Sequence, residues 1–321
     1  MHVPVPPVPP ALPPLPPLPA LPDPPLPPWP GEVVQAGGFS LFVRAAGPAD
    51  GEPAVLVHGL GGASTNWTDL MALLAPTLRS RAPDLPGFGR SAPPADGRYP
   101  LDSHVRAVVA LIEEWGAGPV HLFGNSLGGA TATRLAAERP DLVRTLTLVS
   151  PALPDLRPRR RLDWRLPLIV LPGFGDLVQR RLSGRPAELR ARATIDLVYA
   201  DPATVHPQRL REATEEVTRR TALGHADTAL VRSLRGLVAA QLDRGERGLW
   251  QQAARVQAPV LLVWGRRDRL VDVGLAPRAA RTFPDAELLV LPDAGHVAQL
   301  EDPQAVASAW LRRRAELARR P

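Results

Sequence analysis

Ser126 is the residue whose surroundings most clearly predict chemistry. It stands in Gly124-Asn125-Ser126-Leu127-Gly128, which follows an apolar run ending at Phe123 and precedes a small-residue stretch typical of a helix. A strand, a sharp turn and a helix would hold this serine on strained backbone, with its hydroxyl exposed above a sheet. Glycine is expected at positions 124 and 128 because larger side chains would collide across the turn. The pattern predicts a nucleophilic serine.

A serine hydroxyl needs a base to take its proton, and the base needs an acid to orient it. His296 follows the apolar stretch 287–291, and Asp268 lies just past a strand expected at 259–264. Both partners therefore follow strand ends, and parallel strands would bring all three side chains to one edge of the sheet. We expect Ser126, Asp268 and His296 to form a catalytic triad, with Asp272 as the alternative acid.

The transition state of acyl transfer also needs hydrogen-bond donors for a developing oxyanion. An apolar strand expected at 54–57 runs into His58-Gly59-Leu60-Gly61-Gly62. Such a glycine-rich loop can point its N–H groups inward without intervening side chains. We expect the backbone N–H groups of Leu60 and Leu127 to form the oxyanion hole, and the His58 side chain to anchor the loop by a hydrogen bond.

The elements that must position these residues alternate between strand and helix. Strands are expected near 32–36, 39–45, 54–58, 79–83, 119–124, 144–150, 259–264 and 286–291, and helices near 65–75, 102–115, 127–138, 272–283 and 302–318. This alternation predicts an α/β fold with a mostly parallel sheet covered by helices on both faces. The first two strands read as an antiparallel hairpin.

The interval between the strands near 144–150 and 259–264 is too long for a simple crossover. It contains helical patterns near 176–182, 187–199, 207–223 and 228–242. We expect residues 152–245 to form an inserted α-helical cap over a core domain built from 31–151 and 246–321. Caps exclude water and shape the pocket. Trp164 and Phe174, the largest apolar side chains near its start, are expected to line the substrate pocket.

Taken together, these motifs resemble the α/β-hydrolase superfamily, in its capped, single-domain serine hydrolase branch. The resemblance spans roughly residues 32–315 and is carried by His58-Gly59-Leu60-Gly61-Gly62, Asp84-Leu85-Pro86-Gly87-Phe88-Gly89-Arg90-Ser91, Gly124-Asn125-Ser126-Leu127-Gly128-Gly129, Trp264-Gly265-Arg266-Arg267-Asp268 and Gly295-His296. It implies the α/β-hydrolase fold with an inserted cap. It also implies that Asp84 is structural, in a loop beside the site.

Two comparisons within the superfamily bear on the reaction. The sequence Gly-Asn-Ser-x-Gly-Gly-Ala around Ser126 resembles that of enzymes that hydrolyse carbon–carbon bonds of ring-cleavage products. Those enzymes usually carry Ser-Gly-Pro in the oxyanion loop and an aromatic residue after the histidine, whereas this chain has Leu60-Gly61-Gly62 and Val297. Epoxide hydrolases and haloalkane dehalogenases of the same branch use an aspartate nucleophile, so Ser126 argues against both.

The composition favours an enzyme that needs no metal or cofactor. A chain of 321 residues that is 45% hydrophobic can bury a large core. The absence of cysteine excludes disulfides and thiolate metal sites, and the 7 histidines show no metal-ligand spacing. The net charge of +6 comes without a nucleic-acid motif and with only 5% aromatic residues, so no nucleic-acid partner is expected.

The first 30 residues differ from the rest of the chain because they hold 16 of its 40 prolines. Proline favours extended polyproline II and removes N–H donors, so residues 1–30 are expected to be a disordered tail and a candidate site for a protein partner. The tail lacks the features of a secretory signal peptide, and no segment has the roughly 18 apolar residues of a membrane span. A cytoplasmic location is expected.

These observations predict a serine hydrolase that acts through an acyl-enzyme on a carboxylic ester with an apolar portion, as carboxylesterases and lipases do. One alternative is a carbon–carbon bond hydrolase of ring-cleavage-type diketones, which turnover of a vinylogous diketone against a p-nitrophenyl ester would distinguish. The other is a ligand sensor or scaffold with weak hydrolysis. A partner pull-down with and without residues 1–30, together with the turnover number, would test it.

Overall fold

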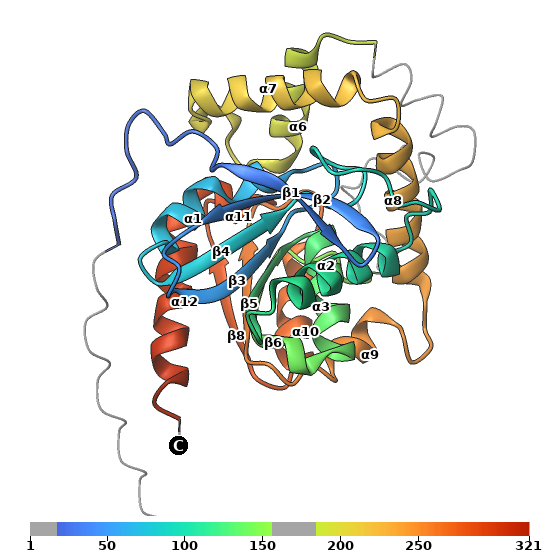
Figure 1. Cartoon of the computed structure of the whole chain (residues 1–321). Coiled ribbons are helices and arrows are strands. Elements are labelled where there is room, and N and C mark those ends of the chain that lie inside the picture. The colour runs from blue at the N-terminus through green and yellow to red at the C-terminus, as the bar shows by residue number, and fades with distance from the viewer. Residues whose placement is uncertain (1–17, 156–183, 321) are drawn as a thin grey trace, which may run out of the picture.

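The computed structural model describes residues 18–155 and 184–320, which form a twisted sheet with helices on both faces (Figure 1). The sheet has eight strands in the order β1-β2-β4-β3-β5-β6-β7-β8. The strands are β1 (Gly31–Ala36), β2 (Phe39–Ala46), β3 (Glu52–Val57), β4 (Leu78–Pro83), β5 (Val120–Asn125), β6 (Val143–Val149), β7 (Val260–Gly265) and β8 (Ala286–Leu291). This arrangement confirms the predicted α/β-hydrolase fold.

Strand directions follow the prediction from the sequence. Strand β2 pairs antiparallel with both β1 and β4, whereas all pairs from β4 to β8 are parallel. Parallel strands need crossover helices, and these cover the two faces of the sheet. Their carboxyl ends meet at one edge, which is the position where open α/β sheets bind ligands.

The helices of the core pack on opposite faces of the sheet. Each face is covered by helices that lie close together in the fold although some are far apart in the sequence (Figure 1). On one face are α1 (Thr68–Leu74), α11 (Ala298–Glu301) and α12 (Pro303–Leu317), and on the other are α2 (Leu101–Trp115), α3 (Leu127–Glu138), α9 (Leu249–Ala253) and α10 (Ala276–Thr282). Short 3-10 turns are η1 (Ser64–Trp67), η2 (Pro140–Leu142), η3 (Pro202–Thr204) and η4 (Val273–Leu275).

Alternation along the strands divides the core between these two faces. In β3, Val55 and Val57 belong to the buried cluster under α2 and α3, whereas Leu56 belongs to the cluster that contains Trp67 and Trp310. Successive side chains of a strand point to opposite faces, so an uninterrupted apolar strand can contribute to both clusters. The sheet is therefore buried on both faces beneath the carboxyl edge that carries the candidate site.

Helices inserted between β6 and β7 lie above the carboxyl edge of the sheet (Figure 1). In the described part they are α6 (Ala187–Val198), α7 (Pro207–Thr221) and α8 (Ala226–Leu242), whereas α9 of the same interval packs on the core. Their bounds agree with the helical patterns near 187–199, 207–223 and 228–242. The fourth expected helix, near 176–182, lies outside the described residues.

Residues 18–30 differ from the expectation of a disordered tail. Leu18, Leu21 and Trp29 pack against the cluster under α1 and α12, and the Trp29 indole donates a hydrogen bond of 3.0 Å to the carbonyl of Thr68. A segment with few backbone N–H donors can still bury apolar side chains on a surface that another element supplies. This part of the proline-rich segment is therefore a strap along the core, and residues 1–17 lie outside the described residues.

The strap also contacts the inserted helices. The guanidinium of Arg209 in α7 donates 2.9 Å to the carbonyl of Leu26 and forms an ion pair with Asp69 of α1, while His206 lies 3.6 Å from the carboxylate of Asp23. The strap, the core and α7 thus meet around one arginine. Within the described residues, no helix is long and apolar enough to cross a membrane.

Candidate active site

Ser126 occupies the turn between β5 and α3 with φ 53° and ψ −113°. A positive φ is strained for any residue with a side chain, and such strain is concentrated at functional sites. A Cβ at position 124 would lie 2.4 Å from the carbonyl oxygen of Gly128, which confirms the expected collision across the turn. At position 128 the reason is different, because a Cβ there would meet the carbonyl of Val57 at 2.2 Å. Glycine at 128 therefore allows α3 to approach β3.

Asp268 and His296 come from the loops after β7 and β8, and their side chains meet. The Nδ1 atom of His296 lies 2.9 Å from Oδ2 of Asp268. The other carboxylate oxygen accepts hydrogen bonds from the backbone N–H groups of Leu270 at 2.8 Å and Val271 at 2.9 Å. The aspartate side chain is 0% exposed and that of the histidine 5%. With Nδ1 donating to a buried carboxylate, Nε2 is the atom able to accept a proton.

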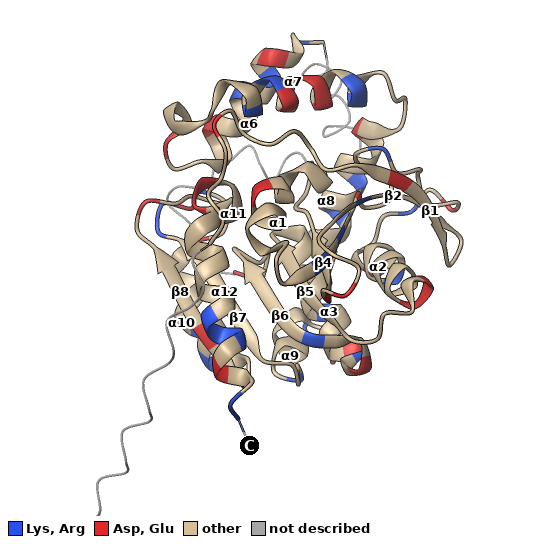
Figure 2. Cartoon of the chain, turned by 60° about the vertical axis from the view of Figure 1, so that its left-hand side comes forward, with Lys and Arg blue, Asp and Glu red and all other residues tan. Residues whose placement is uncertain are grey.

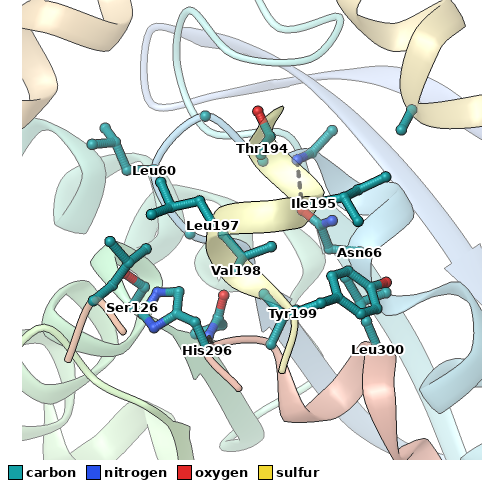
Figure 3. Close-up of a pocket in the computed structure, with 18 of the residues that line it drawn as sticks. Leu60, Asn66, Ser126, Thr194, Ile195, Leu197, Val198, Tyr199, His296 and Leu300 are labelled. Carbon is teal, nitrogen blue, oxygen red and sulfur yellow. Dashed lines mark hydrogen bonds between the residues drawn. The ribbon is translucent and has the colours of Figure 1, made fainter. Parts of the chain in front are cut away.

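Ser126 and His296 line the same cavity (Figure 3). In this view the serine lies next to the imidazole ring, below the helical segment that carries Leu197 and Val198. The alternative acid, Asp272, is exposed, and its carboxylate accepts a 2.6 Å hydrogen bond from the backbone N–H of Gly274 at the start of η4. Of the two candidate acids, Asp268 is the one that contacts His296.

The glycine-rich loop after β3 lies directly against the serine. A Cβ at position 59 would be 3.2 Å from the Cβ of Ser126, and Leu60 faces the cavity (Figure 3). Leu127 is the first residue of α3, so its N–H has no partner within the helix. Both backbone groups expected to bind an oxyanion therefore belong to segments that adjoin the serine.

The imidazole of His58 holds this loop in place, as the sequence predicted. Its Nε2 atom accepts a 2.9 Å hydrogen bond from the N–H of Leu85, so its Nδ1–H donates to the carbonyl of Gly59 at 2.7 Å. Burial lowers the pKa of His58, because a charged imidazolium would lose its hydration. The histidine is therefore a neutral structural group with both nitrogens used.

Asp84 is structural too, as the resemblance implied. Its buried carboxylate accepts hydrogen bonds from the backbone N–H of Ser64 at 2.6 Å and of Arg90 at 2.8 Å. It thus ties the loop 84–91 to the residues that follow the glycine-rich loop. The carboxylate uses its acceptors on backbone donors and does not face the cavity.

The cavity above the serine has a volume of about 1060 Å³. Its roof comes from the inserted helices, which contribute mainly apolar side chains; these include Ala191, Ile195, Leu197, Val198, Val217, Leu234, Leu237 and Val238. Trp164 and Phe174, which the sequence analysis assigned to this wall, lie outside the described residues. The observed wall residues were not predicted from the sequence, although the apolar positions of α6, α7 and α8 are their signal.

The histidine loop is fastened to the segment that follows α6. The carboxylate of Glu301 accepts hydrogen bonds of 2.7 Å from the N–H groups of both Gly295 and Ala200, and the N–H of His296 donates to the carbonyl of Val198 at 2.7 Å. Burial raises the pKa of Glu301 because the ionised form is less well solvated there. The sequence analysis did not identify this residue, since its role depends on contacts between distant segments.

No cluster of three or more histidine, aspartate or glutamate side chains suited to a metal ion occurs within residues 18–155 and 184–320. The acidic and histidine side chains that line the cavity already have protein partners. His296 bonds Asp268 behind the cavity wall, Glu212 pairs with Arg209, and Glu216 pairs with Arg219. The arrangement can deprotonate a hydroxyl and stabilise an oxyanion with backbone donors alone.

Comparison with known proteins agrees with the fold. A family model described as the alpha/beta hydrolase fold matches residues 53–303. Among curated proteins, the chain is 34% identical to a dihydrolipoyllysine-residue acetyltransferase component of an acetoin cleaving system from Pseudomonas putida, over 86% of this chain and 67% of that protein. It therefore spans about two thirds of the length of the acetyltransferase components that it matches.

A second relative is covered almost entirely. It is a 2-hydroxy-6-oxo-6-(2'-aminophenyl)hexa-2,4-dienoic acid hydrolase from Metapseudomonas resinovorans, 30% identical over 89% of this chain and 92% of that protein. Among solved structures, a bacterial membrane phospholipase A superposes with a TM-score of 0.72 at 23% identity, over 89% of this chain and 86% of that one. The match of the family model to residues 53–303, which include Ser126, Asp268 and His296, shows that this chain belongs to the α/β-hydrolase family.

Proposed function

We propose that the chain is a serine hydrolase in which Ser126, His296 and Asp268 form the catalytic triad. The observation that carries the proposal is the 2.9 Å contact between Nδ1 of His296 and Oδ2 of Asp268, beside a serine held at φ 53° in the same cavity. A buried carboxylate that selects one histidine tautomer next to a strained serine is the arrangement that activates a hydroxyl.

The reaction would proceed in two stages. In the first, Nε2 of His296 accepts the Ser126 proton while Oγ attacks the carbonyl carbon, and the backbone N–H groups of Leu60 and Leu127 bind the resulting oxyanion. The imidazolium then protonates the leaving alcohol, which departs as the acyl-enzyme forms. In the second, His296 takes a proton from water while the water oxygen attacks the acyl carbon. The imidazolium then returns that proton to Oγ as the acyl–oxygen bond breaks, which releases the carboxylic acid and free Ser126. Asp268 stabilises the imidazolium in both stages.

The favoured substrate is a carboxylic ester with an apolar portion. The cavity of about 1060 Å³ is large enough for a substrate of considerable size. Apolar side chains of the inserted helices dominate its wall, so an acyl or alcohol chain would gain about 25 cal/mol for each Å² of apolar surface removed from water. The inserted segment, residues 152–245, would act as the cap that supplies this wall.

A carbon–carbon bond hydrolase is the second candidate, because a relative aligned over 89% of this chain is named as the hydrolase of a substituted hexadienoic acid. The same triad would serve that reaction. Turnover of a vinylogous diketone compared with that of a p-nitrophenyl ester distinguishes the two. An ester kcat/KM above the diketone value by an order of magnitude or more supports the esterase, and the reverse ratio supports the second candidate.

Replacing Ser126 with alanine tests the proposal directly. Hydrolysis of p-nitrophenyl butyrate and covalent labelling by a fluorophosphonate are both expected to disappear, with a loss of about 10³-fold or more in kcat. Ser150 offers a matched control, since it also has a positive φ of 44° at the end of the neighbouring strand, and its hydroxyl has no hydrogen-bond partner. The Ser150→Ala variant is expected to retain activity and labelling. A folded Ser126→Ala variant that is still labelled would refute the assignment.

A further inference from the structure

An arginine of the inserted helices binds the oxyanion loop, residues 58–62. Arg220, at the end of α7, donates a hydrogen bond from Nη1 to the carbonyl of Gly61. Figure 2 shows acidic and basic residues along the ribbon of α7, which lies above the sheet. Two other arginines of α7 use different partners: Arg209 pairs with Asp69, and Arg219 binds Glu216 and the carbonyl of Gly89. Arg220 is the arginine of α7 that contacts the residues beside the oxyanion donors.

Two carbonyl groups of the oxyanion loop differ in where their hydrogen-bond donors come from. The carbonyl of Gly59 accepts hydrogen bonds from the His58 imidazole at 2.7 Å and from the Gly62 N–H at 3.0 Å. These bonds close the turn but leave the Gly61 carbonyl to be satisfied from above, by Arg220. Leu230 of α8 also covers this point, 3.3 Å from where a Cβ of Gly61 would lie. The loop is thus enclosed between the core and the inserted helices.

We propose that Arg220 is a positioning residue that clamps the oxyanion loop, so that the Leu60 N–H points at the reacting carbonyl only while α7 is seated. This inference rests on the proposed serine hydrolase function. Arg220 acts through the Gly61 carbonyl, one residue after the donor, and does not itself bind the oxyanion. The position of the cap would therefore determine how well ordered the oxyanion hole is, as well as the shape of the pocket.

The physical case depends on the surroundings of the guanidinium. Burial lowers the pKa of Arg220 below its ordinary value, while Glu216 and Asp227 oppose that change. Arginine remains charged at neutral pH even so, and a charge-assisted hydrogen bond to a carbonyl is about twice as strong as a neutral one. Removing it would leave a carbonyl without its partner at a point where small displacements are costly. A shift of about 1 Å in a catalytic group lowers the rate about 100-fold.

Arg220 also lines the cavity, so its role in positioning must be separated from a role in the wall. A wall residue affects long acyl chains more than short ones, because its effect scales with the apolar surface that it covers. A residue that positions the oxyanion donor affects all esters equally, because every ester forms the same oxyanion. The two roles therefore give different dependences on chain length.

The experiment compares Arg220→Met, Arg220→Lys and Arg232→Met with the wild-type chain. Methionine keeps an apolar stem without the donor, and lysine keeps a donor. Arg232 is the matched control, because it also joins an inserted helix to a glycine of the core, donating 2.7 Å to the carbonyl of Gly97, but it does not line the cavity. For each variant we would measure kcat and KM for acetate and octanoate esters, the melting temperature, and hydrogen exchange of a peptide that covers residues 58–62.

The Arg220→Met variant is expected to lose between about 10- and 100-fold in kcat for both esters, with KM changed less than about threefold. Its loop peptide should exchange faster than in the wild type, Arg220→Lys should recover part of both effects, and Arg232→Met should match the wild type. A kcat within about twofold of wild type, or a loss restricted to the octanoate ester, would overturn the inference. If the wild type hydrolyses neither ester, the proposed function fails. Separately, unchanged hydrogen exchange of the 58–62 peptide in Arg220→Met would overturn the proposed role of Arg220 as a clamp.

Discussion

Replacing Asp268 with asparagine isolates the electrostatic part of the proposed triad. The Oδ1 atom of Asp268 accepts hydrogen bonds from the N–H groups of Leu270 and Val271. In the variant only the amide oxygen can take that position, so the amide NH₂ must face Nδ1 of His296. The imidazole would then accept at Nδ1 and carry its proton on Nε2, where it cannot take the proton of Ser126.

The magnitude follows from this change of tautomer. A triad with its histidine in the wrong tautomer loses about 10⁴-fold in kcat, which corresponds to about 5 kcal/mol of transition-state stabilisation. KM is expected to change little, because Asp268 is fully buried and does not line the cavity. The melting temperature reports whether the variant is folded, since the amide preserves the shape of the carboxylate and its two backbone hydrogen bonds, and reverses the direction of the bond to His296.

The assay is steady-state hydrolysis of p-nitrophenyl butyrate by Asp268→Asn, with Asp272→Asn as the control. Asp272 is also a carboxylate near the end of β7, but it is exposed and accepts a hydrogen bond from Gly274. The control is expected to keep nearly all activity. The reasoning is refuted if folded Asp268→Asn keeps more than about a tenth of the wild-type kcat, and loss of activity in Asp272→Asn alone would transfer the role.

Three further predictions concern the cap, the strap and a buried histidine. Ile195→Ala, which removes wall surface, is expected to lower kcat/KM about tenfold for an octanoate ester and little for an acetate ester, and equal losses for both would contradict its place in the pocket. Deleting residues 1–30 should lower the melting temperature by more than about 5 °C, and Trp29→Ala should lower it by less. If calorimetry shows no change for the deletion, the strap contributes no stability. Burial holds the pKa of His104 at about 3, below its ordinary 6.5, so its stabilising effect is complete above about pH 6.5 and is lost as the pH falls towards 3. The melting temperature of His104→Phe should therefore decline less steeply between pH 6.5 and 3 than that of the wild type. An unchanged slope would show that protonation of His104 does not cause the decline.

Much of the scaffold could be predicted because its signals are local. The apolar run before Gly124 and the small residues after Gly128 set the strand–turn–helix, and the hairpin around Gly37 follows from two short strands joined by glycines. Strand and helix bounds in the core agree with the sequence patterns to within a few residues because each depends on periodicity within one segment. Ser126, Asp268 and His296 could be selected because each follows the end of a strand in the order typical of this family.

Contacts between distant segments could not be predicted in this way. Only the folded chain distinguishes Asp268 from Asp272, because both follow β7 and one alone reaches His296. The strap provides the clearest difference between sequence and structure: proline content alone predicts that 1–30 cannot form a core, yet Trp29 packs on a surface supplied by α1 and α12. Burial of a segment depends on what lies opposite it, and composition carries no information about that.

The sequence by itself therefore determined the class of fold and the chemical types available at the sheet edge. The tertiary structure decided which groups surround them: the wall formed by α6, α7 and α8, the bond between Glu301 and the histidine loop, and the bond from Arg220 to the glycine-rich loop 58–62. The physical reason is that strand–turn–helix geometry is set by neighbouring residues, whereas a pocket wall or a clamp exists only when segments far apart in the chain pack together.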